Sequence, residues 1–301
     1  MPNVKIEYAR SVRNMAEEYG ILETAARLEI KEDSVRRYIN SLKDRTAKIL
    51  IFDIETALMT VQTFHLGKQR INPDLVVKDF NCLSWSAKWL CDSDIKSAVC
   101  TPKEAIEHDD NRVIGLMWQL FDKADIIIAH NAFQFDIRRL NYRWLINGFG
   151  PPSPYQVVDT LRESRKLFGS ASHKLDYYCR MLSLDTKIKT NLELWQECDK
   201  GNPEALAEML EYNKMDVNIL EDFYLRIRPW IKGHPNLGLY MESDQPVCRN
   251  CGSANLTWLD EYYTSMNRYK ASLCECGARG RHRVSDLSKE EKQNLVRNIA
   301  Y

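Results

Sequence analysis

The chain has 301 residues, with 42 Lys and Arg balanced by 42 Asp and Glu, so its formal net charge is zero. This balance excludes a protein that binds nucleic acid through bulk positive charge, and any such binding must use local basic patches. The 44% of hydrophobic residues can form a core, and no apolar run approaches the roughly 20 residues of a membrane span. We therefore expect no membrane contact and a cytoplasmic location, or the host cytoplasm if a phage encodes the protein.

Residues 1–47 are expected to be helical, because apolar residues recur at helical spacing. Residues 14–42 fit a helix-turn-helix, with Ala25 at the helix crossing and Arg36 and Arg37 exposed to meet DNA phosphates. The turn has Glu29 where Gly is usual, so a helical hairpin packed on another domain or a partner is the alternative. The expected core positions are Leu28, Ile30, Val35 and Tyr38.

Residues 48–230 predict an α/β domain, since short apolar runs alternate with longer amphipathic stretches. The expected strands lie at 48–57, 82–90 and 124–130. The expected helices lie at 111–123, 134–148 and 203–227. A Gly- and Pro-containing stretch predicts a linker over residues 231–246.

Carboxylates stand at the ends of these expected elements. Asp53 and Glu55 are two apart in the first strand, so both project from one face of the sheet. Asp136 follows a later strand at the expected start of a helix, where open α/β sheets bind ligands. Tyr212 and Asp216 are four apart in the long helix and share one side of it.

Four carboxylates of this kind suit two-metal hydrolysis. Two divalent cations about 3.5–4 Å apart activate water and stabilise the leaving oxygen of a phosphodiester. Carboxylate oxygens favour Mg²⁺ or Mn²⁺. Tyr212 would orient the attacking water, because its phenol both donates and accepts hydrogen bonds.

The combination resembles the DEDD superfamily of 3′–5′ exonucleases on the ribonuclease H-like fold. Its three motifs correspond to Asp53-Ile-Glu55, to Asn131 through Phe135-Asp136, and to Tyr212 four residues before Asp216. The tyrosine in the third motif matches the tyrosine subgroup, DEDDy, which includes proofreading domains of DNA polymerases.

The resemblance, which covers roughly residues 48–228, implies roles for single residues. Asp53, Glu55 and Asp216 would hold the catalytic cation, and Asp53 with Asp136 the second. Asn131 and Phe135 would contact substrate, and Lys174 is a candidate for the same role. For Lys174 and Asp159, a role in supporting the site and a role in contacting substrate are equally expected. His130 and His173 are expected to have structural roles.

Nine cysteines, an odd number, argue against a closed disulfide framework. Two pairs, Cys248-x-x-Cys251 and Cys274-x-Cys276, have the spacing of two zinc knuckles, so we expect one structural Zn²⁺ in a zinc ribbon over 247–284. The others are expected to be small buried apolar residues; they are Cys82, Cys91, Cys100, Cys179 and Cys198.

Basic and aromatic residues interleave in the expected ribbon, and Arg281 and Arg283 follow its last ligand. This pattern suits phosphate contact and base stacking, with protein docking or a purely structural role as alternatives. Residues 285–301 predict a C-terminal helix that begins with a capping box at Ser288.

Together these patterns predict a metal-dependent 3′–5′ exonuclease that releases 5′-mononucleotides. DNA is the preferred substrate, since a helix-turn-helix more often reads DNA, and RNA 3′-end trimming is the alternative. A non-enzymatic DNA-binding protein on a nuclease-like scaffold and a structure-specific endonuclease are the competing hypotheses. A proofreading role would need a separate replication or repair protein as partner.

Overall fold

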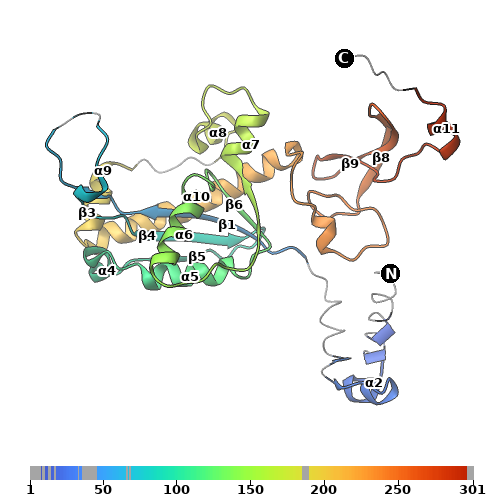
Figure 1. Ribbon diagram of the computed structural model, residues 1–301, viewed down its shortest axis with the longest axis horizontal. Coiled ribbons are helices and arrows are strands. Elements are labelled where there is room, and N and C mark those ends of the chain that lie inside the picture. Colours follow the sequence, from blue (N-terminus) through green and yellow to red (C-terminus); the bar gives the residue numbers. More distant parts are fainter. Residues whose placement is uncertain are drawn as a thin grey trace. The chain divides into compact units, whose positions relative to one another are not determined.

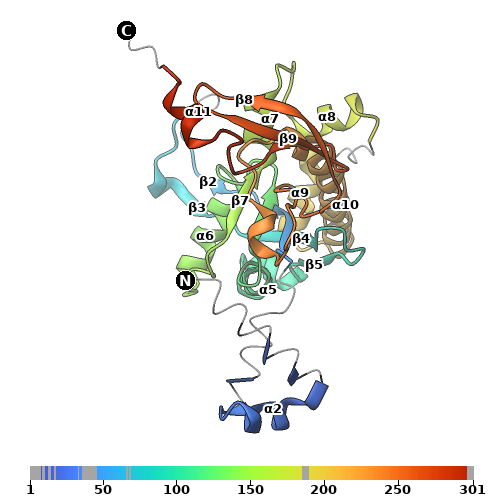
Figure 2. The same ribbon diagram turned by 90° about the vertical axis from the view of Figure 1, so that its right-hand side faces the viewer.

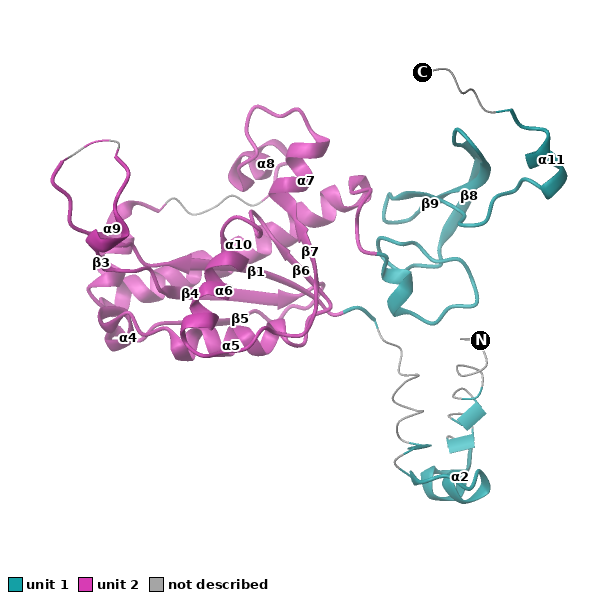
Figure 3. Cartoon of the chain, in the orientation of Figure 1, with its two compact units in different colours: residues 1–47, 236–301 teal, residues 48–235 magenta. Residues whose placement is uncertain are grey.

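The computed structural model describes residues 46–65, 67, 69–184 and 190–296, together with 8, 11–12, 15–16, 18–32 and 34–35 of the N-terminal segment. It divides into two compact units (Figure 3): one comprises Lys48–Pro235, and the other comprises Met1–Ala47 and Asn236–Tyr301. The first unit thus continues past residue 230, where the sequence suggested a boundary, because Ile231 and His234 are buried in it. Among the described residues no helix is long and apolar enough to cross a membrane.

A mixed five-stranded sheet forms the centre of the unit Lys48–Pro235 (Figure 1). Its order is β5-β4-β1-β6-β7, with β6 parallel to β1 and β7, and β4 antiparallel to β1 and β5. The strands are β1 (Ile49–Thr56), β4 (Cys82–Trp89), β5 (Lys96–Val99), β6 (Ile126–Ala129) and β7 (Gln156–Asp159). A separate two-stranded sheet pairs β2 (Thr60–Val61) with β3 (Val76–Lys78).

Helices cover both faces of the central sheet (Figures 1 and 2). They are α4 (Pro102–Glu107), α5 (Asn111–Phe121), α6 (Asp136–Ile146), α7 (Thr160–Leu167), α8 (Leu175–Met181), α9 (Leu192–Asp199) and α10 (Pro203–Ile227). The strands and helices expected from the sequence are all present, with ends shifted by a few residues. The α/β class with a mixed sheet between helices is therefore confirmed.

Strand β1 divides its side chains between two different layers. Phe52 is fully buried and packs edge-on against Phe121 of α5, with ring centroids 4.9 Å apart. Asp53 points the opposite way, to α10, where Asn213 donates a hydrogen bond to it over 2.6 Å. This alternation lets one strand supply apolar side chains to the core and polar side chains to a site.

Two buried ion pairs tie the layers to the sheet. Arg143 of α6 binds Asp110, just before α5, through two nitrogens at 2.7 and 2.8 Å. Lys88 of β4 lies 2.7 Å from Glu221 of α10. Because each charge is buried beside its partner, removing either member would leave an uncompensated charge, and the pairs fix the packing of these elements.

The second unit holds a three-stranded antiparallel sheet in the order β10-β9-β8. Its elements are α2 (Ile21–Arg27), β8 (Leu256–Tyr263), β9 (Arg268–Cys274), β10 (Arg279–Arg281) and α11 (Lys289–Gln293). Helix α11 begins at Ser288, where both hydrogen bonds of the expected capping box form. The described residues also include short helical turns at Pro73–Leu75, Arg228–Trp230 and Leu237–Tyr240.

Around α2, Ala25 and Val35 are buried together, with Leu28 and Ile30 packed against them. Glu29 takes a left-handed conformation, φ 54°, at the position where a helix-turn-helix usually has Gly. Expected residues Tyr38, Arg36 and Arg37 lie outside the described residues.

The expectation for the scattered cysteines is wrong at one position. Cys82, Cys100, Cys179 and Cys198 are buried, whereas Cys91 is exposed. Cys91 lies in the turn after β4 with φ 64°, and its backbone N–H donates to Glu221. Residues in a turn at the end of a strand lie on the surface, so the Cys91 side chain is exposed although it is apolar. The apolar residues that flank Cys91 in the sequence did not indicate this turn.

Candidate metal centres

Three carboxylates meet where β1 ends beside α10. One oxygen each from Asp53, Glu55 and Asp216 lie within 4.8 Å of one another. Asp216 is only 2% exposed. Carboxylates this close repel one another, and a divalent cation between them removes the repulsion. The all-oxygen donor set fits Mg²⁺ or Mn²⁺.

Helix α10 carries two of the predicted residues into place. It begins where Asn202 accepts hydrogen bonds from the N–H groups of Glu204 and Ala205, with Pro203 in the first turn. More than two helical turns after this start, Tyr212 and Asp216 project from the same side of α10. Tyr212 is half-buried, and its ring meets Trp195 edge-on at 6.4 Å.

Asp136 lies against the same strand but is not one of the three clustered carboxylates. It is 2% exposed, and its carboxylate accepts hydrogen bonds from the backbone N–H groups of Asp136 and Ile54. Burial, reinforced by the charge of Asp159, raises the pKa of Asp136 to about 7. A bound cation would favour the ionised form, because an opposite charge offsets the cost of burial.

The turn before Asp136 is held by Asp159. Its carboxylate accepts backbone N–H groups of Asn131 at 3.0 Å and Phe133 at 3.2 Å, and it also caps α7 by accepting from Leu161 and Arg162. Asn131 adopts φ 84°, a left-handed conformation that Asn tolerates better than most residues. Asp159 therefore supports the turn and the start of α7.

The predicted substrate contacts take different positions. Phe135 is half-buried and packs on the core, with the guanidinium of Arg139 4.4 Å from its ring centre. Lys174 is exposed and precedes α8. His130 hydrogen-bonds Thr160 at 2.9 Å and the carbonyl of His173 at 3.0 Å, as expected of a structural residue.

Asn213 is a site residue that the sequence reasoning missed. It is fully buried, and its amide donates to Asp53 over 2.6 Å. Its Oδ1 is buried and has no hydrogen-bond partner among the described residues. The sequence did hold a signal for this role. Asn213 stands three residues before Asp216 on the same helix, and residues i and i+3 share one side of a helix.

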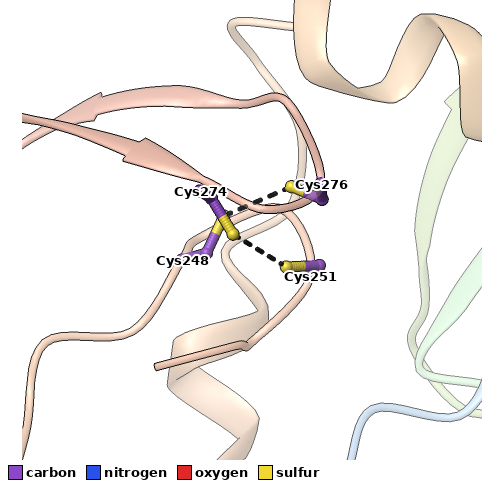
Figure 4. Close-up of side chains that lie close together, drawn as sticks. All are labelled: Cys248, Cys251, Cys274 and Cys276. Carbon is purple, nitrogen blue, oxygen red and sulfur yellow. Dashed lines mark hydrogen bonds between the residues drawn. The ribbon is translucent and has the colours of Figure 1, made fainter. Parts of the chain in front are cut away.

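The four predicted zinc ligands converge from two segments (Figure 4). The Sγ atoms of Cys248 and Cys276 lie 3.8 Å apart, and those of Cys251 and Cys274 lie 3.5 Å apart. A tetrahedron with Zn–S bonds of about 2.3 Å has edges of about 3.8 Å, so the spacing fits one Zn²⁺.

Tight turns follow both cysteine pairs, and backbone N–H groups surround the sulfur of Cys248. Each pair is followed by a glycine at positive φ: Gly252 at 78° and Gly277 at 86°. Although burial opposes it, the pKa of Cys248 is lowered because the N–H groups of Asn250 and Cys251 point at its sulfur. Such N–H donors favour the ionised sulfur that binds metal.

The basic residues predicted near the ribbon lie on its surface. Arg281 is exposed in β10, and Arg283 is exposed just after it. The guanidinium of Arg281 stacks 3.7 Å from the ring centre of Tyr269.

No protein-family model matches the chain. A search of curated proteins also finds no significant match.

Proposed function

We propose that the unit Lys48–Pro235 is a metal-dependent 3′–5′ exonuclease of the DEDDy type that releases 5′-mononucleotides, with DNA as its preferred substrate. The observation that carries the proposal is the meeting of Asp53, Glu55 and Asp216 within 4.8 Å. A second support is Tyr212, one helical turn before Asp216 on the same side of α10.

The residues have distinct roles in this proposal. Asp53, Glu55 and Asp216 would hold one Mg²⁺ or Mn²⁺, and Asp53 and Asp136 the other. Bound there, such ions supply Lewis acidity and lower the pKa of water. Tyr212 positions the water through its phenol hydroxyl, and Asn213 fixes the carboxylate of Asp53.

Labelled oligonucleotides test the proposal. Single-stranded DNA and RNA carrying a 5′ label are incubated with Mg²⁺, with Mn²⁺ or with no added cation. We expect a ladder shortening from the 3′ end, faster on DNA. Asp53→Asn and Asp216→Asn should each lower the rate at least about a thousandfold, because metal-held Lewis acidity is worth several kcal/mol.

Asp222→Asn is the matched control, since Asp222 is an exposed carboxylate on the same helix. It should cleave like the wild type. Internal cuts would instead indicate an endonuclease. Binding of DNA without cleavage by the folded wild type would indicate a scaffold protein, and a clear preference for RNA would indicate a 3′-end trimming enzyme.

A further inference from the structure

The zinc-bearing sheet has two faces of different character. Residues paired across antiparallel strands point to the same side. Tyr262 pairs with Tyr269, Leu259 with Ala271, and Ala271 in turn with Arg281. These pairs, with Thr257–Leu273 and Leu273–Arg279, define one side, called here the arginine face, which consists of Thr257, Leu259, Tyr262, Tyr269, Ala271, Leu273, Arg279 and Arg281.

The opposite face is neutralised by its own carboxylates. Arg268 lies 3.2 Å from Glu261 and 3.5 Å from Glu291. A shallow hollow beside them is lined by Asp260, Glu261 and Asp286 as well as Lys270. A polyanion would meet these acids there.

The arginine face has the opposite balance. None of its residues is acidic, and both Arg279 and Arg281 are exposed. In the part of the chain that the structure describes, neither arginine forms an ion pair. Tyr262 is 50% exposed, and Arg281 already stacks on Tyr269 at 3.7 Å. The face thus offers two free positive charges beside flat aromatic surfaces.

We infer that the arginine face binds single-stranded nucleic acid. Arg279 and Arg281 would contact phosphates, while Tyr262 and the Arg281–Tyr269 stack would receive unpaired bases. Stacking on aromatic side chains contributes about 1–3 kcal/mol per base and accepts any base. In a duplex the bases are already stacked on one another, so an open, flat face favours a single strand.

This binding deepens the proposed nuclease function, because it names the form of the substrate, yet it is measurable without cleavage. A circularised, fluorescent oligo-dT has no 3′ end to enter an exonuclease site. Its binding to the full-length, zinc-loaded Asp53→Asn protein is followed by fluorescence anisotropy at several salt concentrations.

On this background, Arg279→Gln together with Arg281→Gln should weaken binding at least tenfold. The salt slope should fall by about 1.4, since each phosphate contact to a single strand contributes about 0.7. Tyr262→Ala should weaken binding at least fivefold. Lys270→Gln, which removes an exposed charge from the opposite face of the same sheet, should change binding less than twofold.

Zinc content and circular dichroism verify that each variant is folded. Loss of binding by Lys270→Gln but not by the arginine variant would overturn the inference. So would absence of binding to the circle, or tighter binding to duplex of the same length. Cleavage of linear DNA by the wild type is scored separately, so either the face or the nuclease can fail without the other.

Discussion

At the scale of single residues, the acidic site depends on an amide. Asn213 is buried and donates to Asp53 over 2.6 Å, so it fixes the orientation of a carboxylate that the proposal assigns to both cations. Partners of metal ligands orient them, and their loss commonly costs about 10–100-fold in affinity or activity.

Asn213→Ala should therefore lower the cleavage rate about tenfold and raise the Mg²⁺ concentration needed for half-maximal rate. Rates at a series of Mg²⁺ concentrations measure both effects. Asp222→Ala, which removes an exposed polar side chain from the same helix, is the control and should behave as the wild type. An Asn213→Ala enzyme with an unchanged Mg²⁺ requirement would show that the amide is dispensable.

Asp136 gives the protein a dependence on pH. Its pKa is raised by burial from 3.8 to about 7, so between these values the folded protein keeps a proton that the unfolded chain has lost. Raising the pH across this interval therefore destabilises the folded state. The destabilisation is complete once the pH exceeds the folded pKa.

In urea unfolding without added Mg²⁺ or Mn²⁺, we expect Asp136 to contribute a loss on the order of 2 kcal/mol between pH 5 and pH 8. Asp136→Asn cannot ionise and should remove that part of the loss. Added Mn²⁺ should reduce the pH-dependent loss in the wild type, because a bound cation favours the ionised form of Asp136, whereas Asp136→Asn has no such loss to reverse. Parallel pH profiles for the two proteins would contradict this account.

At the scale of elements, Asp159 joins a turn to a helix. One carboxylate accepts N–H groups from the turn at Asn131 and Phe133 and from the first turn of α7. The turn leads directly into α6, which begins at Asp136. The position of Asp136 thus depends on a residue at the end of the neighbouring strand β7.

Asp159→Ala should lower the free energy of unfolding by about 3 kcal/mol, the sum of a lost helix cap and two lost turn bonds. It should also slow cleavage, because Asp136 loses its support. Asn191→Ala, which removes the cap of α9 alone, should cost about 1 kcal/mol and leave cleavage intact. Urea unfolding and the oligonucleotide assay measure both; equal effects of the two variants would refute the role of Asp159.

At the scale of the whole molecule, the zinc ligands and the carboxylates lie in different compact units. Structural zinc contributes directly to the folding of the small module that binds it. Lys48–Pro235 has its own core around Phe52 and Phe121. We therefore expect loss of zinc to affect the two units unequally.

Cys276→Ser should lower bound zinc from about one ion per chain to near zero and abolish binding of circular oligo-dT. Cleavage of a short linear oligonucleotide should change less than twofold. Cys91→Ser, at an exposed cysteine outside the cluster, should keep its zinc. Bound zinc and the cleavage rate are measured for each variant. If Cys276→Ser lost its cleavage activity together with its zinc, the two units would depend on each other.

Periodicity and spacing in the sequence determined the main strands and helices, the mixed α/β class, the carboxylates of β1 and α10 and the four clustered cysteines. These features are local: alternation in a strand and the four-residue repeat of a helix are set by backbone geometry. The same local patterns misplaced Cys91, whose exposure depends on a turn.

Only the tertiary structure decided which distant residues meet. Asn213 and Asp53 are 160 positions apart, and Asp159 reaches a turn 26 to 28 positions earlier. The division of ribbon residues between an arginine face and a neutralised face follows from strand register, including the irregularity between Leu259 and Glu261. Such contacts arise when the chain packs in three dimensions. Packing brings together side chains whose separation in the sequence follows no regular spacing.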